Sequence, residues 1–403
     1  MDDHKPPEIA SGIYWVGVVD WNLRDFHGYE TPKGGSYNAY LIVDEKITLI
    51  DTVKAPFAAE MLRRISQIVD PAKIDYVISN HVEMDHSGSI SAIMDIAPNA
   101  KLFASSKGKA GLLEYYKEEG FDKWDLQVVE TGTELKIGKR TLMFIEATML
   151  HWPDSMQTYL KEDRILFSND AFGQHIATSK RFDDEVEDVM EDAGIYYANI
   201  LLPFGSQVLK YVGKLKELDV SPAMIAPAHG VIWRKDVQRI VEAYARWARG
   251  DTVPKVLVIY DTMWGSTEKM AMQIVEGART SGVEVRLRHL RKNDWSMTMK
   301  ELMDASVVAI GSPTMNNDMF FTISGFLTYM KGLRPKGKKY FLFGSYGWGG
   351  GAVRAMEKEM ESGKFELAME SMQVKFRPYE EDKKACRNIG YKLGEIAKGN
   401  AKS

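Results

Sequence analysis

The sequence predicts a two-domain protein of the α/β and α+β classes. Its 403 residues are too many for one ordinary hydrophobic core. Short β-rich segments mix with helices in the first part, and strands alternate regularly with helices after residue 254. Arg249–Pro254 (RGDTVP) brings Gly, Asp and Pro together between the two patterns, as a hinge does. We therefore expect one domain at residues 1–250 and a second at residues 254–403.

The first part is expected to contain short strands with helices between them. β-branched or aromatic runs bounded by Gly, Asp and Lys predict the strands. The apolar spacing of Ala58–Val69 predicts a helix, and a second helix is expected at Asp236–Ala248. The predicted strands are Ile13–Asp20, Tyr37–Val43, Ile47–Asp51, Tyr76–Ser79, Lys101–Ala104, Leu126–Val129, Thr141–Glu146 and Ile165–Ser168.

After the hinge, five predicted strands alternate with helices, which is the pattern of a doubly wound parallel sheet. The predicted strands are Lys255–Tyr260, Val283–His289, Val307–Gly311, Tyr340–Phe343 and Met369–Phe376. The predicted helices are Ser266–Ser281, one that ends at Leu302–Ser306, Ile323–Met330, Val353–Glu361 and Glu381–Ala397.

The charge and composition of the chain argue against nucleic acids and membranes as partners. The chain carries 52 Lys plus Arg against 56 Asp plus Glu, a formal net charge of -4, so no overall positive field predicts nucleic-acid binding. No apolar run approaches the ~18 residues of a membrane span. The first residues, MDDHKPPEIASG, do not resemble a signal peptide. We expect a cytoplasmic protein with no nucleic-acid or membrane partner.

Cys386 is the only cysteine in the sequence. One thiol excludes an intrachain disulfide, a zinc site of four cysteines, and an iron–sulfur or rubredoxin centre within the chain. Any metal must therefore be held by His, Asp and Glu side chains.

The strongest functional signal is residues 81–86, HVEMDH, which follow the predicted strand Tyr76–Ser79. Four ligand-type side chains in six residues cannot share one face of a helix or strand, so a loop must present them. Imidazole and carboxylate without thiolate suit zinc, iron or manganese. Any one such residue would more often be a hydrogen-bonded loop residue or a helix cap, but the joint pattern favours a metal site. The candidate ligands are His81, Glu83, Asp85, His86, His151, Asp170 and His229.

Three loops of the second part indicate an anionic ligand. Strand Lys255–Tyr260 runs into Asp261–Thr267, where hydroxyls and backbone N–H groups at a strand-to-helix turn form an anion cradle. This loop is neither G-x-G-x-x-G nor a Walker loop, which disfavours a dinucleotide or ATP. For this loop alone, a capped helix without ligand is the alternative. Ser312–Asn317 and Ser345–Gly350 follow the third and fourth strands, and in a flavodoxin-like strand order all three loops meet at the switch point of the sheet.

The order of the candidate metal ligands resembles the metallo-β-lactamase superfamily, whose hydrolases carry H-x-H-x-D-H followed by His, Asp and His. Here Glu83 replaces the second His. With this replacement and a second part that resembles flavodoxin, essentially the whole chain is similar to the flavodiiron proteins. The resemblance implies an N-terminal metallo-β-lactamase-like αββα sandwich and a C-terminal flavodoxin-like doubly wound five-stranded parallel sheet.

The resemblance also implies two non-haem irons and FMN. It assigns His81, Glu83 and His151 to the first iron, Asp85, His86 and His229 to the second, and Asp170 to both as a bridge. In some members, the imidazole that matches His86 turns away from the metal. Trp264 or Trp348 is expected to stack on the flavin ring. The expected FMN-binding residues are Thr262, Met263, Trp264, Gly265, Ser266, Thr267, Ser312, Pro313, Thr314, Met315, Asn316, Asn317, Ser345, Tyr346, Gly347, Trp348 and Gly349.

Groups behind the ligands should orient them and supply protons. His27, in the segment RDFHGY, matches a site-facing histidine of the family. His175 and Tyr197 are further candidates, for which a packing role is the alternative. Trp152–Asp154 follow His151 and are expected to fix its loop.

The resemblance implies reduction of dioxygen to water, of nitric oxide to nitrous oxide, or of both. A flavin that takes up two electrons and releases them singly suits this chemistry better than hydrolysis. The electron donor must be external, either a separate rubredoxin or a reduced deazaflavin coenzyme. Because FMN and irons must approach closely, the family assembles as a head-to-tail homodimer, and we expect this assembly or a dimer of such dimers.

Two other functions fit parts of the sequence. A zinc hydrolase of the metallo-β-lactamase type with a flavodoxin regulatory domain is the first, and Glu83 argues against it. An electron carrier or redox sensor with a vestigial metal site is the second, and the intact ligand set argues against it. The basic run Lys331–Lys339 is expected near the flavin end, where it would attract an acidic carrier, with a solvated loop as the alternative.

Overall fold

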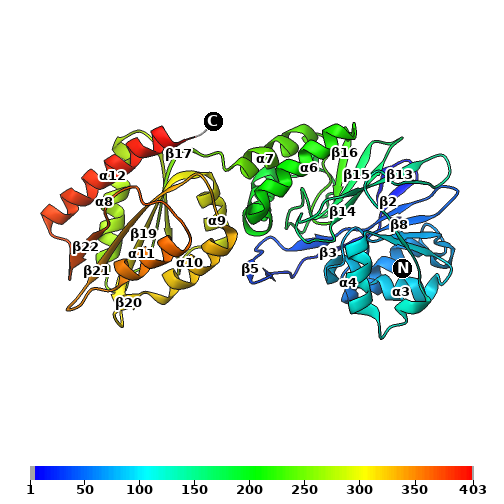
Figure 1. Ribbon diagram of the computed structural model, residues 1–403, viewed down its shortest axis with the longest axis horizontal. Coiled ribbons are helices and arrows are strands. Elements are labelled where there is room, and N and C mark those ends of the chain that lie inside the picture. The colour runs from blue at the N-terminus through cyan, green and yellow to red at the C-terminus, as the bar shows by residue number, and fades with distance from the viewer. Residues whose placement is uncertain (1–4, 402–403) are drawn as a thin grey trace. The chain divides into compact units, whose positions relative to one another are not determined.

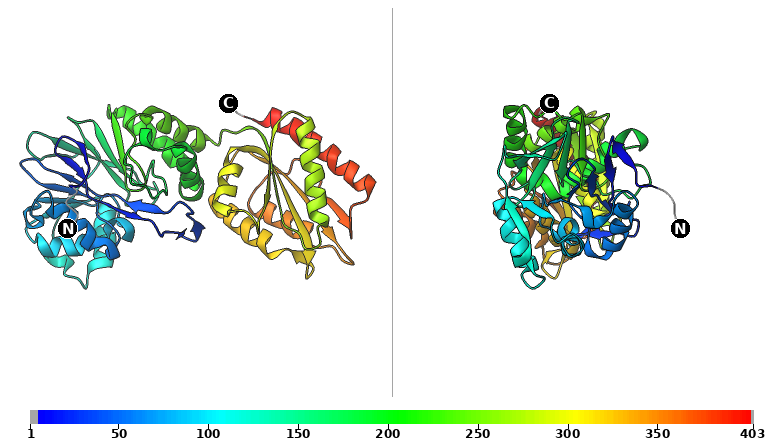
Figure 2. Two further views of the ribbon diagram at one scale, coloured as in Figure 1. Left: turned by 180° about the vertical axis from the view of Figure 1, so that it is seen from behind. Right: turned by 90° about the vertical axis from the view of Figure 1, so that its right-hand side faces the viewer.

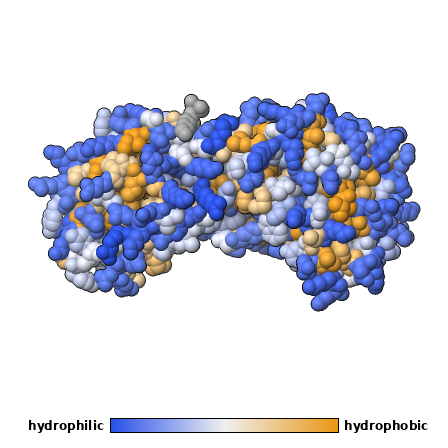
Figure 3. Space-filling model, viewed as in Figure 1, coloured by the Kyte–Doolittle hydropathy of each residue, from blue (hydrophilic) through white to orange (hydrophobic). Residues whose placement is uncertain are grey.

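The computed structural model describes residues 5–401, which divide into two compact units (Figure 1). The first unit comprises Met1–Tyr196 and Ser206–Ala245, and the second comprises Tyr197–Gly205 and Arg246–Ser403. The β-sheets and the hydrophobic cores of the two units are separate. In the face that Figure 3 shows, hydrophilic residues predominate in both units and hydrophobic residues form separate patches. Between residues 5 and 401, no helix is long and apolar enough to cross a membrane.

Two sheets form the centre of the first unit. One is a mixed sheet in the order β1-β2-β7-β8-β9-β10-β11, and the other has the order β12-β13-β14-β15-β16. Side chains alternate along the strands, so that Ile50 and Ile78 pack between the two sheets with Phe144, whereas Leu49 and Val77 face the helices. Helices α1, α3 and α4 cover the first sheet, and α6 and α7 lie against the second (Figures 1 and 2). This is the expected αββα sandwich.

The elements of the first unit are mostly short. The large sheets contain β1 Glu8–Ala10, β2 Ile13–Trp15, β7 Tyr40–Ile42, β8 Thr48–Ile50, β9 Tyr76–Ile78, β10 Lys101–Ala104 and β11 Asp125–Val128, and then β12 Glu134–Lys136, β13 Thr141–Glu146, β14 Met156–Leu160, β15 Ile165–Asn169 and β16 Met224–Pro227. Two small antiparallel sheets pair β3 Val18–Asp20 with β6 Gly35–Tyr37, and β4 Asp25–Phe26 with β5 Tyr29–Glu30. The helices are α1 Ala58–Ser66, α2 Met84–Ser87, α3 Ile90–Ile96, α4 Ser106–Tyr116, α5 Val189–Tyr196, α6 Gly205–Glu217 and α7 Val237–Arg249.

Several strands of this unit differ from the sequence expectation. The predicted strand Ile13–Asp20 is divided into β2 and β3 at Gly17, where an added Cβ would lie 2.3 Å from the carbonyl oxygen of Tyr37. Strands β1, β12 and β14 were also not predicted, and β14 has a physical reason: it buries two polar residues that hide its apolar pattern. These residues are hydrogen-bonded inside: Gln157 accepts from the Tyr211 hydroxyl, and Thr158 donates to Asn80 over 2.8 Å.

The second unit contains the expected doubly wound sheet. Its five parallel strands have the order β18-β17-β19-β21-β22, and the short β20 pairs antiparallel with the end of β19. Helices α8 and α12 cover one face, and α9, α10 and α11 cover the other (Figures 1 and 2). The strands are β17 Val253–Tyr260, β18 Glu284–His289, β19 Ala305–Met315, β20 Asp318–Met319, β21 Lys339–Tyr346 and β22 Met372–Lys375. The helices are α8 Ser266–Thr280, α9 Trp295–Asp304, α10 Phe321–Leu333, α11 Ala352–Ser362 and α12 Glu380–Asn400.

The position expected for the basic run Lys331–Lys339 is wrong. This run joins the end of α10 to the start of β21. In a parallel sheet, the starts of the strands lie at the edge opposite to their carboxyl ends. The run therefore lies at the edge opposite to the loops that follow β17, β19 and β21, and it does not flank the expected flavin site.

Candidate metal centre and flavin site

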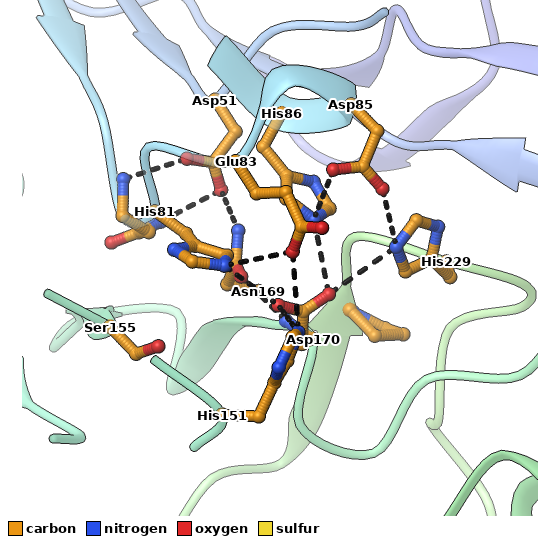
Figure 4. Close-up of polar contacts among 12 residues, drawn as sticks. Asp51, His81, Glu83, Asp85, His86, His151, Ser155, Asn169, Asp170 and His229 are labelled. Carbon is orange, nitrogen blue, oxygen red and sulfur yellow. Dashed lines mark hydrogen bonds and ion pairs between the residues drawn. The ribbon is translucent and has the colours of Figure 1, made fainter. Parts of the chain in front are cut away.

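The seven candidate ligands converge at one edge of the two sheets of the first unit (Figure 4). The loop after β9 carries His81 and Glu83, and the short helix α2 that follows it carries Asp85 and His86. Asp170 directly follows β15. His151 lies in the loop after β13, and His229 follows β16. Strand ends distant in the sequence thus present their side chains to one another.

These side chains form two groups. His81, Glu83, His151 and Asp170 offer ligand atoms within 4.8 Å of one another, and so do Asp85, His86 and His229. Asp170 faces both groups. Its Oδ1 lies 3.0 Å from His86 Nε2 and 3.3 Å from His229 Nε2, while its Oδ2 lies 3.6 Å from His81 Nε2 and 3.5 Å from His151 Nε2. One oxygen toward each group is the arrangement that a bridging carboxylate requires.

The far nitrogens of two imidazoles are fixed from behind. His81 Nδ1 lies 2.8 Å from a carboxylate oxygen of Asp154, which also accepts from the Val82 N–H over 2.8 Å. His229 Nδ1 lies 2.7 Å from the carbonyl oxygen of Ser36. Each acceptor holds a proton on Nδ1, so Nε2 points into the cluster, as in metal-binding histidines.

The buried cluster fits a metal cation. Both carboxylate oxygens of Asp85, Asp170 Oδ2 and His229 Nε2 are buried and have no hydrogen-bond partner among the residues that the structure describes. Burial opposes charge on Asp170, yet the neighbouring imidazoles hold the pKa of its carboxyl well below its usual range. Burial likewise opposes protonation of His229, but Asp170 and Asp85 raise its pKa to about 10. The carboxylates therefore stay ionised, and a cation would neutralise their buried charge. A set of hard carboxylate oxygens and imidazole nitrogens suits iron.

Asp51 is a further residue of the site, and sequence reasoning missed it. Its buried carboxylate accepts from the Asn80 N–H over 2.7 Å, from Asn80 Nδ2 over 3.0 Å and from Asn169 Nδ2 over 3.3 Å. Asn80 precedes His81 and Asn169 precedes Asp170. Asp51 therefore ties together the two loops that carry ligands of both groups. Its only sequence signal is that it ends a predicted strand.

The expected orienting residues have different positions. His27 Nε2 lies 2.6 Å from Glu83 Oε1, and this hydrogen bond raises the pKa of His27. The ring of His175 lies 5.1 Å from that of His229, and its Nε2 lies 2.8 Å from the Tyr29 hydroxyl. Burial lowers the pKa of His175 to about 3, so it is neutral at physiological pH.

Tyr197 is not where the sequence expectation placed it. Its ring packs against Trp247 at 5.2 Å, in the second unit. The preceding residue, Tyr196, reaches the cluster instead and donates from its hydroxyl to Asp170 Oδ1 over 3.1 Å. Successive residues of a helix point about 100° apart. A choice between adjacent tyrosines therefore depends on the rotation of the helix about its axis, which the sequence does not specify.

The three expected loops of the second unit surround one pocket of about 660 Å³. Trp264 and Trp348 are each 92% exposed at its rim, so two indole faces are available to a planar ligand. Sequence reasoning missed Phe376 because it made this residue the end of the strand Met369–Phe376, whereas Phe376 begins a fourth loop, after β22. The pocket is lined by Met263, Trp264, Ser266, Pro313, Thr314, Met315, Asn316, Asn317, Ser345, Tyr346, Gly347, Trp348, Gly349 and Phe376.

The other expected FMN residues support the loops without lining the pocket. Gly265 has a φ of 79° immediately before α8, a conformation that glycine adopts without strain, and its N–H donates to Thr262 Oγ over 3.0 Å. The buried hydroxyls of Thr267 and Ser345 lie 2.9 Å apart and join the first loop to the third. Ser312 accepts from the Phe320 N–H over 2.9 Å. The start of α8 thus offers N–H groups to an anion, which fits a flavin phosphate.

Asp261 anchors the first of these loops, and its role was also missed. Its carboxylate is fully buried and accepts from the Thr262 N–H over 2.7 Å and from Thr322 Oγ over 2.5 Å. Arg291 donates from Nε to both its oxygens over 2.8 and 3.1 Å, and from Nη2 to the carbonyl oxygen of Thr262. His289 Nε2 lies 3.1 Å away. Three loops at the carboxyl edge of the sheet are thereby joined.

Comparison with known proteins identifies both units. The family described as ODP family beta lactamase matches residues 36–230, and the flavodoxin family matches residues 258–390. A protein named nitric oxide reductase from Moorella thermoacetica is 47% identical over 96% of this chain and 98% of its own length. A protein named coenzyme F420H(2) oxidase from Methanothermobacter marburgensis is 41% identical over 96% of this chain and 97% of its own length.

Solved structures agree over the whole chain. Rubredoxin oxygen:oxidoreductase from Desulfovibrio gigas has a TM-score of 0.95 and 39% identity, and covers 98% of this chain and 99% of its own. The flavodiiron protein from Giardia intestinalis has a TM-score of 0.94 and 40% identity, with 99% of both chains covered. With a cluster of imidazoles and carboxylates in one unit and a flavodoxin pocket in the other, the chain belongs to the flavodiiron protein family.

Proposed function

We propose that the chain is an oxidoreductase that reduces dioxygen to water, nitric oxide to nitrous oxide, or both. The observation that carries this proposal is that one chain combines the cluster bridged by Asp170 with a flavodoxin-type pocket. Hydrolysis needs no flavin, and the relatives are named as an oxidase, an oxidoreductase and a nitric oxide reductase. This disfavours a zinc hydrolase with a flavodoxin regulatory domain.

The ligand assignment follows the two groups of donor atoms. We assign His81, Glu83 and His151 to one iron, Asp85, His86 and His229 to the other, and Asp170 to both. His86 Nε2 faces the cluster, 3.0 Å from Asp170 and 3.4 Å from Asp85, which supports its inclusion. When bound, the two irons and FMN supply the electrons that a diatomic oxidant takes up.

Three side chains of this protein hold protons beside the cluster. His27 holds one at Nε2 toward Glu83, and Tyr196 holds one at its hydroxyl toward Asp170. His175 shares a proton with the Tyr29 hydroxyl through Nε2 and packs against His229. His27 is 44% exposed at its side chain, so it connects the buried carboxylates with solvent. Tyr196 takes the role that the sequence suggested for Tyr197.

An external donor and a second copy of the chain complete the proposal. A rubredoxin and a reduced deazaflavin coenzyme are the candidate donors, in line with the names of the relatives from Desulfovibrio gigas and Methanothermobacter marburgensis. We expect a head-to-tail homodimer in which each FMN serves the partner's irons. The exposed Trp264 and Trp348 at the pocket rim support a docking role for this edge. If sedimentation showed the protein to be a monomer while it turned over at full rate, the dimer would be excluded. The cytoplasmic location remains a prediction.

The decisive experiment combines metal analysis with turnover of both gases. The purified protein should contain iron rather than zinc, and should consume dioxygen, nitric oxide or both under anaerobic handling with several reduced donors. Asp170→Ala should keep FMN but lose the iron pair and turnover. The exposed Asp125→Ala, whose carboxylate lies 3.8 Å from Lys101, is the matched control and should keep both. Full activity in Asp170→Ala, or zinc with hydrolase activity in the wild-type protein, would refute the proposal.

A further inference from the structure

A second pocket in the first unit has a marked excess of positive charge. It has a volume of about 330 Å³ and is lined by none of the seven metal-facing residues. Strands β2 and β3, helix α1 and the loop around residue 180 form its walls. Among residues 5–401, its lining has four cationic side chains and one carboxylate, that of Glu60; the cations are Lys5, Arg63, Arg64 and Arg181. The family function described above makes no use of this pocket.

Arg181 is the central cation of the pocket. Its guanidinium lies 4.1 Å from the ring centre of Trp15, and its Nη2 donates to the carbonyl oxygen of Thr178 over 2.8 Å. Within residues 5–401, no carboxylate forms an ion pair with this guanidinium, and Glu185 accepts from the Arg181 backbone N–H instead, over 3.0 Å. Partly buried arginines are normally paired with an acid, because a desolvated charge is costly. Burial, followed by the nearby charge of Arg64, lowers the pKa of Arg181 to about 10.

Arg64 places a second guanidinium over the same ring, 4.8 Å from its centre. Its Nη2 donates to Glu60 over 2.6 Å, and its Nη1 donates to the carbonyl oxygen of Gly17. The carboxylate of Glu60 thus pairs with Arg64 and not with Arg181. The repulsion between the two guanidiniums is relieved only in part by the ring, by Glu60 and by the nearby charge of Glu185.

Trp15 holds both cations in place. It is only 2% exposed, and its indole N–H donates to Asn38 Oδ1 over 2.9 Å. Two guanidiniums on a fixed ring lose little freedom when a ligand binds, and the planar fork of arginine matches an oxyanion. Beside them, the pocket is apolar, with Pro6, Val19 and the 57%-exposed Trp21.

We propose that this pocket binds a small molecule through an oxyanion group, a phosphate or a carboxylate, held by Arg181 and Arg64 with Arg63 at the rim. The apolar wall at Trp21 contacts the remainder of that molecule. A volume of about 330 Å³ accommodates a molecule of small-metabolite size. This site is independent of the metal cluster and of the flavin pocket, and its failure would leave the proposed function untouched.

Calorimetric titration of the full-length protein, with iron and FMN bound, tests the site. The probes are inorganic phosphate, phenyl phosphate and succinate in a low-salt buffer, with sodium chloride at matched ionic strength as the reference. We expect saturable binding of one stoichiometric equivalent. Arg181→Gln should weaken it roughly tenfold or more, since a charge-assisted pair is lost. Tighter binding of phenyl phosphate than of succinate identifies a phosphate ester, and the reverse order identifies a carboxylate.

Two further variants guard against misinterpretation. Arg239→Gln removes an arginine of α7 that is 64% exposed and pairs with Asp236 at 3.2 Å, so it should bind the probes as the wild-type protein does. Arg64→Gln leaves the Arg181–Trp15 stack in place and should also weaken binding, which keeps the test valid if Arg181→Gln misfolds. The proposal is overturned by absence of saturable binding of every probe, or by equal affinity in the Arg181→Gln, Arg64→Gln and Arg239→Gln proteins.

Discussion

Lys338 gives a sharp prediction about stability and pH in the flavodoxin unit. It precedes β21, is 8% exposed, and donates from Nζ to the carbonyl oxygen of Met303 over 2.8 Å. Burial lowers its pKa from 10.5 to about 7, although the charge of Asp304 acts in the opposite direction. In the unfolded chain, the same amine keeps its ordinary pKa near 10.4.

The direction of the effect follows from proton binding. Between about pH 7 and 10.5, the unfolded chain holds a proton on Lys338 that the folded chain has released, so the free energy of unfolding rises with pH across this window. Below pH 7, both states are protonated and the folded state bears the full cost of the buried charge. The interval from 10.5 to about 7 corresponds to about 5 kcal/mol, at 1.36 kcal/mol for each pKa unit.

Lys338→Met should therefore stabilise the unit most at low pH. The unpaired carbonyl of Met303 would cost about 1–3 kcal/mol, which leaves a net gain of about 2–4 kcal/mol at pH 6. The gain should shrink as pH rises and become a loss of about 1–3 kcal/mol near pH 10.5, where only the cost of the unpaired carbonyl remains. Urea unfolding followed by FMN fluorescence at pH 6, 8 and 10 measures it, with the exposed Lys336→Met as control. A gain that is the same at all three pH values, or destabilisation at pH 6, would refute the reasoning.

Three other substitutions test the loops and the packing. Asp261→Asn should raise the dissociation constant of FMN roughly tenfold or more, because the carboxylate anchors the loop expected to hold the phosphate, and should change that of riboflavin little. Fluorescence titration measures both constants, and an equal loss of affinity for FMN and riboflavin would contradict this reasoning. Asp154→Ala should weaken iron binding about 10–100-fold in competition with a chelator at unchanged FMN content, and unaltered iron affinity would exclude an orienting role. Gly277→Ala would place a Cβ 1.9 Å from the carbonyl oxygen of Arg387, so a thermal melt should show that the protein is destabilised by about 1–3 kcal/mol. The control is Gly213→Ala, whose added Cβ has no neighbour within 4 Å and should not destabilise the protein.

The sequence alone determined the features that depend on local spacing. Six consecutive residues contain four of the ligand candidates, and such a cluster is recognisable without any knowledge of the fold. The alternation of strands and helices after residue 254 likewise predicts the doubly wound sheet, because each buried strand and each amphipathic helix has its own periodicity. The three loops around the flavin pocket could be predicted from their positions after successive parallel strands.

Only the tertiary structure decided which distant side chains meet. Asp51 looks like an ordinary strand end in the sequence, and Asp154 and Asp261 look like ordinary loop acids; each acquires its role from partners on other elements. Tyr196 reaches the cluster and Tyr197 does not occupy that position, because the rotation of a helix about its axis is set by the packing of its whole length. Arg64 and Arg181 likewise meet over the ring of Trp15 only because tertiary packing brings their elements together. Periodicity specifies which face of an element is buried, whereas the contacts across that face depend on where the chain places the next element.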